Sequence, residues 1–184
     1  AGRVIVCGFD GFELPDRVGS WLTSDTVAGL ILFKRNVESL EQVSSLLDAC
    51  SDASSASLPP LLSVDQEGGR VARLREGVLQ LPPMRALASF GDTTLTRDAG
   101  QALGRQLRAL GLNLDFAPVL DVDTNPDNPV IGDRSFGADP AVVVRHALAF
   151  ADGELRAAAA DDRVVALRQR FRKRMDLRRP CSVL

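Results

Sequence analysis

The strongest constraint on the fold is a repeated pairing of a short apolar run with a helical pattern. Four apolar runs are separated by such patterns: Val4–Phe9, Gly29–Phe33, Leu61–Val64 and Leu112–Phe116. The first is nearly continuous, as in strands buried on both faces, and the last alternates apolar with polar residues. Strands that alternate with helices in this way predict a parallel sheet with right-handed crossovers.

Several helix ends are marked in the sequence. Ser39 and Gln42 form a predicted capping box, and the apolar residues behind it keep helical spacing. A second helix is expected from about Leu95 to Leu110, with Gly111 at its C′ position. A weaker helix is expected from Pro15 to Leu22.

The segment from residue 75 to residue 93 is predicted to be irregular, because Pro82-Pro83 argues against a helix there. Asp139-Pro140 is typical of an N-cap followed by proline at the first helical position. The helix that begins there is expected to end near Phe150.

Polar or charged residues directly follow each predicted strand. They are Asp10 after the first, Lys34, Arg35 and Asn36 after the second, Asp65 and Glu67 after the third, and Asp121 onward after the fourth. The carboxyl ends of parallel strands lie at one edge of a sheet, so these residues are expected to form a site there.

Four strands are too few for a closed barrel. A complete (β/α)₈ barrel takes about 250 residues, and this chain has 184. The expected fold class is therefore α/β: a partial TIM (β/α)₈-type barrel of about four parallel strands with helices, plus a C-terminal helix. That helix is predicted in the alanine- and arginine-rich segment Ala157–Arg174, where Val164–Leu167 is a less favoured fifth strand. The chain is divided accordingly into a barrel portion, residues 1–153, and a basic helical tail, residues 154–184.

The basic tail is the main charge asymmetry. The chain has a net charge of −2, yet residues 163–179 carry eight arginines and lysines against Asp176 alone. Such a tail can mark a contact with nucleic acid or anionic lipid. With Phe171 as its only ring for stacking, a solvated helix face is favoured over nucleic-acid binding.

The remaining composition is that of an ordinary globular protein, 45% hydrophobic and 25% charged. No apolar run of membrane-spanning length and no signal-peptide pattern is found. Cys7, Cys50 and Cys181 lack CxxC spacing, which favours reduced thiols and a cytoplasmic location. A single histidine without clustered cysteines argues against zinc, and neither metal nor cofactor is expected.

Two stretches are the candidate site. Asp65–Arg73, DQEGGRVAR, sets a strand-end carboxylate before a glycine turn and two arginines, and it matches neither phosphate-binding glycine motif. Ion pairs bordering a turn are the alternative interpretation. The second is a long polar loop after Pro118 that carries Arg134, and loops of this length are usually functional or disordered. Its prolines and glycines favour a shaped loop.

Three motifs together resemble the family-3 glycoside hydrolases. They are GLILFKRN at 29–36, VDQEGGRVARL at 64–74, and DFAPVLDV at 115–122 continuing to IGDRSF at 131–136. The resemblance covers about residues 3–150 and is greatest to the β-N-acetylglucosaminidase branch that acts in peptidoglycan recycling. The NPDNPVIGDRSF form favours that branch over the β-glucosidases, which usually carry a tryptophan-containing version.

The resemblance implies retaining hydrolysis of terminal β-linked N-acetylglucosamine from peptidoglycan-derived saccharides. It also implies that Asp65, Arg73 and Arg134 hold that sugar, a role that suits a carboxylate acceptor and two guanidinium donors. Asp121 and Asp133 are expected to shape the loop by accepting backbone N–H groups.

The bond-breaking groups of the family are missing. Its nucleophilic aspartate on a late strand and its His-Asp pair in a KHFPGHGD-type loop have no counterpart, so no catalytic residue is assigned. His146 is interpreted as structural and Asp161-Asp162 as capping or solvated. We therefore expect a truncated family member that binds sugar without turnover; the alternative is a non-catalytic sugar-binding or regulatory half-barrel. Its open sheet edges predict a homodimer, or an edge covered by the C-terminal helix.

Overall fold

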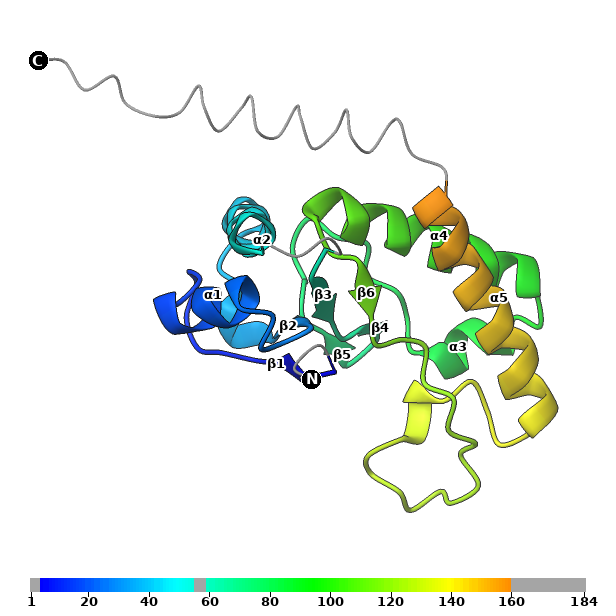
Figure 1. The fold of residues 1–184 in the computed structure, drawn as a ribbon. Coiled ribbons are helices and arrows are strands. Elements are labelled where there is room, and N and C mark those ends of the chain that lie inside the picture. The colour runs from blue at the N-terminus through cyan, green and yellow to red at the C-terminus, as the bar shows by residue number, and fades with distance from the viewer. Residues whose placement is uncertain (1–3, 55–58, 160–184) are drawn as a thin grey trace, which may run out of the picture.

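The computed structural model describes residues 4–54 and 59–159. At its centre lies a four-stranded parallel sheet in the order β1-β2-β3-β6, as the alternating pattern predicted (Figure 1). The strands are β1 (Val6–Cys7), β2 (Gly29–Leu32), β3 (Leu61–Val64) and β6 (Leu114–Asp115). The outer two are shorter than their apolar runs, although hydrogen bonds from Asn113 N to Leu62 O and from Phe116 N to Val64 O extend the pairing of β6.

The helices flank the two ends of this sheet. Helices α1 (Asp16–Thr23) and α2 (Leu40–Ala53) lie beside β1 and β2, whereas α4 (Thr93–Leu110) and α5 (Pro140–Ala159) lie beside β6 (Figure 1). Strand and helix side chains meet in one core, whose members include Leu30, Leu32, Leu47, Leu62, Val64, Leu103 and Phe150. No described helix combines the length and apolar character that a bilayer crossing requires.

Most predicted helix ends are confirmed. Gly111 has a φ of 110° at the end of α4, and Asp139 Oδ1 accepts the Ala141 N–H at 2.8 Å at the start of α5. Ser39 Oγ accepts the Gln42 N–H at 3.1 Å. The capping box is altered in one respect, because the Gln42 carboxamide accepts from Glu38 N rather than from Ser39 N.

The predicted irregularity of residues 75–93 is confirmed for 75–83, Pro82-Pro83 included, and wrong for 84–89. Helix α3 (Met84–Ser89) begins directly after Pro83, which stands at the N-cap with extended backbone. A proline there sacrifices no helical hydrogen bond, since the first N–H groups of a helix have no partner within it. Burial of Met84, Leu87 and Ala88 then stabilises this short helix.

Helix α5 also extends to Ala159 rather than ending near Phe150. Its second half packs on α4 at very short range: a Cβ on Gly153 would lie 2.1 Å from Arg97 O, and one on Gly100 would lie 2.4 Å from Phe150 O. This packing against α4 stabilises α5 beyond the end near Phe150 that the sequence predicts. The predicted domain boundary at 153/154 falls within α5 and stays a prediction. Residues 157–159 of the predicted tail helix belong to α5, whereas its residues 160–174, which include Asp161-Asp162 and Val164–Leu167, lie outside the described residues.

The two cysteines in the described part of the chain are free thiols. Cys50 lies on α2 with 0% of its surface exposed, and burial raises its pKa to about 12. Cys7 on β1 is only partly buried, and burial raises its pKa as well.

Candidate sugar-binding site

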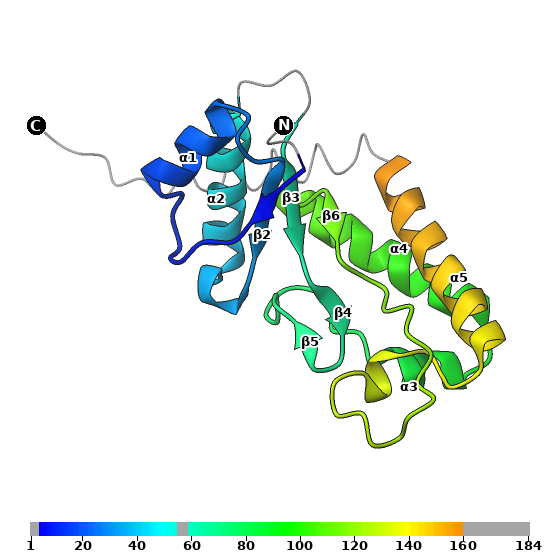
Figure 2. The ribbon, with the colours of Figure 1, turned by 60° about the horizontal axis from the view of Figure 1, so that its bottom comes forward.

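The carboxyl ends of the strands share one edge of the molecule. Beyond β1 and β2, Arg35 Nε lies 2.6 Å from Asp10 Oδ1, and the buried Asn36 side chain donates to Phe9 O and Gly11 O at 3.0 and 2.9 Å. Strand β3 leads into an antiparallel hairpin of β4 (Gln66–Gly68) and β5 (Val71–Ala72), which lies at the same end as the long loop after β6 (Figure 2). The predicted gathering of polar strand-end residues is therefore confirmed for the first three strands.

The hairpin is fixed from inside by the Gln66 side chain, which is 1% exposed. Its Oε1 accepts the N–H groups of Arg73 and Leu74 at 2.9 and 3.0 Å, and its Nε2 donates to Leu74 O at 2.8 Å. Its backbone N–H donates to Asp115 Oδ1 at 2.9 Å, which ties the hairpin to β6. The sequence analysis predicted a glycine turn here and missed the hairpin.

Asp65 and Arg73 face each other across the base of this hairpin. Arg73 Nη2 donates to Asp65 Oδ2 at 2.9 Å. The Arg73 side chain is 28% exposed and that of Asp65 22%, so solvent reaches both. Within the described residues, Asp65 Oδ1 and Arg73 Nη1 form no hydrogen bond, and Arg73 Nε is buried without a hydrogen-bond partner. The pair is thus ordered but not saturated.

Arg134 contacts the same hairpin through Glu67. Its Nε and Nη2 donate to the two Glu67 carboxylate oxygens at 2.8 and 2.7 Å, a bidentate pair. Glu67 is 4% exposed. The hydrogen bonds to Glu67 are the main reason that the pKa of Arg134 is raised, and the nearby charges of Asp121 and Asp65 add to it. Arg134 therefore lies close to Asp65 and is held by a different carboxylate.

Sequence reasoning missed Glu67 as the partner of Arg134, although a signal was present. Glu67 stands two residues after Asp65, and residues at i and i+2 of an extended chain point to the same side.

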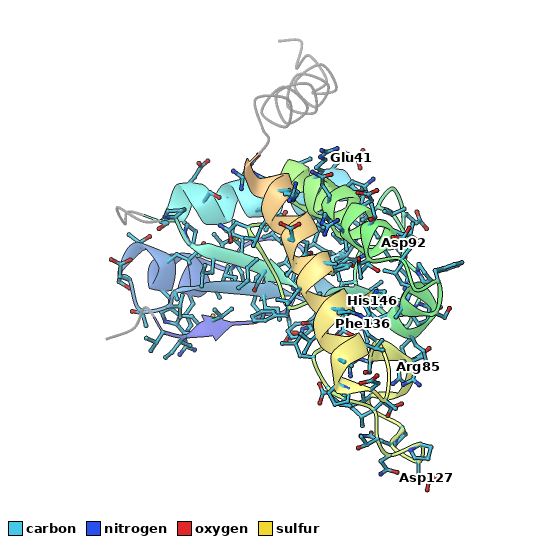
Figure 3. The ribbon with its side chains drawn as sticks, turned by 90° about the vertical axis from the view of Figure 1, so that its right-hand side faces the viewer. Glu41, Arg85, Asp92, Asp127, Phe136 and His146 are labelled. Carbon is cyan, nitrogen blue, oxygen red and sulfur yellow. The ribbon has the colours of Figure 1, made fainter. Side chains whose placement is uncertain are left out.

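The loop that carries Arg134 is held by two further arginines. Arg85 on α3 bonds to Asp123 at 2.5 Å and to Gly132 O at 3.2 Å. Arg70, in the hairpin turn, donates to the carbonyls of residues 129–131. Figure 3 shows Arg85 and Phe136 at the base of the loop and Asp127 at its tip.

The prediction that Asp121 and Asp133 accept loop N–H groups was wrong. Asn125 Oδ1 accepts from Asp127 N, and Asn128 Oδ1 accepts from Val130 N and Ile131 N. Asp133 instead lies 3.8 Å from Arg70 Nε. Asparagine and aspartate side chains can both form such local turns, so sequence alone did not separate them.

A hollow of about 530 Å³ opens beside Arg73. It is lined by Phe33, Lys34, Arg35 and Arg73, and the guanidinium carbons of Arg35 and Arg73 lie 4.6 and 5.9 Å from the Phe33 ring centroid. The hollow has aromatic and cationic walls, but Asp65 and Arg134 do not line it. Of the three predicted residues, the structure brings Asp65 and Arg73 into contact and places Arg134 beside them.

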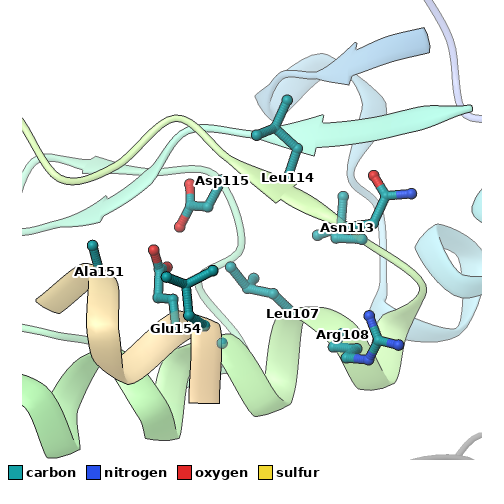
Figure 4. A pocket seen from close by; sticks show the side chains of 10 residues that line it. Leu107, Arg108, Asn113, Leu114, Asp115, Ala151 and Glu154 are labelled. Atoms are coloured by element: carbon teal, nitrogen blue, oxygen red, sulfur yellow. The ribbon is translucent and has the colours of Figure 1, made fainter. Parts of the chain in front are cut away.

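A second cavity, of about 340 Å³, lies between β6, α4 and α5 (Figure 4). In it the Asp115 and Glu154 carboxyl groups face each other, and Asp115 Oδ2 and Glu154 Oε1 are buried without a partner. Burial raises the pKa of Asp115 to about 7; the charges of Asp65 and Glu67 add to this rise, whereas hydrogen bonds to the Gln66 N–H and to Glu154 oppose it. Burial likewise raises the pKa of Glu154 to about 9, and the charge of Asp115 and the hydrogen bond to it raise it further. Sequence reasoning did not identify this pair, because 39 positions separate its members.

His146 is structural, as predicted. It is 1% exposed, its Nδ1 lies 2.7 Å from Thr96 Oγ1, and its ring stacks on Phe136 with centroids 5.7 Å apart (Figure 3). Burial lowers its pKa. Among the described residues, no three His, Cys, Asp or Glu side chains gather in a way that would hold a metal ion.

The decisive comparison is with protein-family models. Residues 8–171 match the model described as "Glycosyl hydrolase family 3 N terminal domain". The chain belongs to glycoside hydrolase family 3. The partial-barrel fold is therefore confirmed both by the four-stranded parallel sheet and by the family match.

Individual relatives of this family-3 chain agree. It is 40% identical over 156 residues to a beta-hexosaminidase of Stenotrophomonas maltophilia strain R551-3, which covers 82% of this chain and 45% of the relative. The chain thus spans about half the length of the curated relatives it matches. Among solved structures it is similar to a family-3 β-N-acetylglucosaminidase from Paenibacillus sp. FPU-7 at 40% identity and a TM-score of 0.80, covering 85% of this chain and 30% of that one. NagZ from Neisseria gonorrhoeae in complex with N-trifluoroacetyl-D-glucosamine matches at 32% identity and a TM-score of 0.76, covering 83% and 46%.

Proposed function

We propose that this chain binds a terminal N-acetylglucosamine residue at the carboxyl end of β3, beside the β4–β5 hairpin. Asp65, Arg73 and Arg134 are the side chains that contact the sugar. The observation that carries the proposal is the pair of neighbouring arginine–carboxylate contacts, Asp65–Arg73 and Glu67–Arg134, at one end of the hairpin. Both lie where α/β folds place their ligands.

The free hydrogen-bonding capacity of these groups suits a sugar. Asp65 Oδ1 is available to accept from a hydroxyl group, and Arg73 Nη1 is available to donate. Arg134 uses three of its five N–H donors, two on Glu67 and one on Val130 O, so two remain. Charge-assisted hydrogen bonds of this kind are about twice as strong as neutral ones.

The activity that we propose for the whole protein is retaining hydrolysis of terminal β-linked N-acetylglucosamine from peptidoglycan-derived saccharides in the cytoplasm. The support is the set of relatives, which are beta-hexosaminidases and β-N-acetylglucosaminidases. Retention needs a nucleophilic carboxylate about 5–5.5 Å from an acid/base carboxyl group. Near the site, Asp65 and Glu67 are both engaged by arginines. We therefore propose that this chain alone binds the sugar without cleaving it.

The alternative function is a non-catalytic sugar-binding or regulatory half-barrel. Turnover of 4-nitrophenyl N-acetyl-β-glucosaminide tests whether this chain cleaves the sugar. No turnover together with sugar binding is the expected result, whereas turnover that is abolished in Asp65→Asn would show that the chain carries its own catalytic groups.

Sugar binding itself is tested by titrating N-acetylglucosamine into the labelled protein and following amide and guanidinium NMR signals. Signals of Asp65, Arg73 and Arg134 are expected to shift, and Asp65→Asn is expected to weaken binding about tenfold because one charged hydrogen-bond acceptor is lost. Asp98→Asn on the exposed face of α4 makes the same charge change and is expected to leave binding intact. Equal weakening by both variants, or no shift at millimolar sugar, would contradict the proposal.

A further inference from the structure

We infer that Arg70 is a positioning residue: it fixes the backbone from which Arg134 projects and thereby sets the site geometry. The role in sugar binding rests on the function proposed above, whereas the effect on Arg134 is measurable without any sugar. Arg70 itself needs no contact with the ligand.

Arg70 grips three consecutive carbonyl groups. It stands in the turn between β4 and β5, and its Nη1 donates to Pro129 O at 3.0 Å. Its Nη2 donates to Val130 O at 2.5 Å and to Ile131 O at 3.1 Å. The planar guanidinium fork is suited to bridging several acceptors, which an ammonium group does less well.

The gripped segment leads directly into Arg134. Ile131 is the N-cap of the short 3₁₀ helix η2 (Gly132–Arg134). The Val130 carbonyl accepts from Arg70 and also from Arg134 Nη1 at 3.1 Å. The Val130 carbonyl oxygen therefore links the side chains of Arg70 and Arg134 directly.

These contacts close a ring through the hairpin. Glu67 on β4 holds the head of the Arg134 side chain, and Arg70, three residues later, holds the backbone before it. Arg70 thus fixes the backbone at the start of the Arg134 side chain, and Glu67 fixes the guanidinium group at its end. Without Arg70, Glu67 alone would have to orient a side chain that projects from an exposed loop.

The other restraints on the loop come from α3 or from the loop itself. Arg85 secures Asp123 and Gly132, and the Asn125 and Asn128 turns are local. Val130 is 61% exposed, so apolar packing contributes little there. The Arg70–Asp133 ion pair is 3.8 Å long between half-exposed side chains, a kind of pair that contributes little in water. The carbonyl contacts of Arg70 are therefore the hydrogen bonds that tie residues 129–131 directly to the hairpin.

The experiment compares the full chain with Arg70→Met, which keeps the length of the side chain and removes its donors. Arg70→Lys is the conservative variant, and Arg105→Met on the exposed face of α4 is the matched control. The main readout is the Nε–H NMR signal of Arg134, with amide hydrogen exchange of residues 129–135 as a second. In Arg70→Met the Nε–H signal is expected to shift or broaden and the exchange to accelerate about tenfold, whereas Arg105→Met should match the wild type.

The sugar arm measures the affinity for N-acetylglucosamine in the same proteins. Arg70→Met is expected to weaken binding about tenfold, with Arg70→Lys between it and the wild type, while the thermal midpoint of the whole chain stays within a few degrees. An unchanged Arg134 Nε–H signal in Arg70→Met would overturn the inference, and so would a displaced signal with unchanged sugar affinity. A wild-type protein that ignores the sugar would instead overturn the proposed function, and the Nε–H readout would still decide whether Arg70 positions Arg134.

Discussion

The Glu67 carboxylate is the most buried charge at the site, with 6% of its side chain exposed against 22% for Arg134. Glu67→Gln keeps the shape and removes the charge, so the guanidinium loses one of its two hydrogen bonds, where it would face an NH2 group, and keeps the other with a neutral acceptor. We expect the free energy of unfolding to fall by about 2 kcal/mol, within the range for hydrogen bonds to charged groups. Urea denaturation monitored by circular dichroism measures this change.

A surface pair provides the comparison for that measurement. Arg156 and Asp152 form an exposed i,i+4 contact at 2.9 Å. Arg156→Gln is expected to change stability by less than about 0.5 kcal/mol. If Glu67→Gln lowered the free energy of unfolding by no more than Arg156→Gln does, the Glu67–Arg134 pair would contribute no more to stability than a surface ion pair.

Sequence reasoning succeeded for side chains whose position follows from a strand end and failed for those set by distant contacts. Asp65 and Arg73 lie only eight positions apart, so their proximity could be predicted from the sequence. The Glu67–Arg134 contact spans 67 positions and the Arg70–loop contacts span about 60, and no local pattern specifies them.

At the scale of elements, the close crossing of α4 and α5 depends on glycine. Gly153→Ala would place a methyl group against Arg97 O and Gln101 N, at 2.1 and 2.8 Å before any relaxation. Backbone atoms cannot yield cheaply, so we expect a loss of about 2 kcal/mol despite the better helix propensity of alanine. Gly19→Ala in α1 is the control: its methyl group would lie 3.6 Å from Leu14, and we expect a gain of up to about 1 kcal/mol. Thermal unfolding distinguishes the two, and equal effects would contradict the steric argument.

The Asp115–Glu154 pair makes the docking of α5 on β6 sensitive to alkali. Both pKa values are raised, to about 7 and about 9, so the folded state retains protons that the unfolded chain has already released. The unfolding free energy is therefore expected to decline as pH rises from about 4 to about 9, and the favourable protonated state is complete at the acid end.

Glu154→Gln tests that sign. The variant should lose less stability than the wild type between pH 5 and pH 9 in urea titrations. Asp152→Asn changes a neighbouring carboxylate whose pKa is lowered by Arg156 and Arg97, and it should leave the alkaline decline in place. A decline of the same size in wild type and Glu154→Gln would contradict the assignment.

The elements themselves were predicted where apolar spacing and capping agreed, as for α2, α4 and the four parallel strands. The failures have physical reasons. Helix α3 depends on the burial of three side chains, and it is too short to show a repeating apolar pattern in the sequence. Helix α5 extends beyond its predicted end near Phe150 because it packs on α4. The β4–β5 hairpin depends on Gln66, a buried polar group that bonds to residues seven and eight positions away.

At the scale of the molecule, the sheet has β1 and β6 at its two ends. Beside β6, helix α5 presents apolar side chains to solvent, with Val144, Leu148 and Leu155 exposed by 55%, 67% and 70%. These residues and Ala151 follow i, i+4, i+7, i+11 spacing and form one stripe. Figure 3 shows α5 in front when this side faces the viewer.

The sequence predicts a homodimer through open sheet edges, or an edge covered by the C-terminal helix, and the apolar stripe beside the β6 edge is the face at which the homodimer can be tested. Sedimentation equilibrium is expected to give a dimer for the wild type, and Leu148→Lys is expected to shift it to monomer because a charge enters the apolar stripe. Phe12→Lys, which precedes α1 at the other end of the sheet and is also exposed, should leave the dimer intact. A monomeric wild type at high micromolar concentration would refute the prediction.

The buried thiol of Cys50 is a natural reporter of how often α2 opens. Alkylating reagents attack the thiolate, and a group that ionises only near pH 12 behind a closed helix offers them neither charge nor access. At neutral pH, Cys50 can be alkylated only after α2 separates from the sheet. The rate of alkylation therefore reports the frequency of this local opening, and no probe has to be introduced. In mass-spectrometric time courses Cys7 should be labelled first, and equal rates at both positions would mean that α2 leaves the sheet far more often than its packing implies.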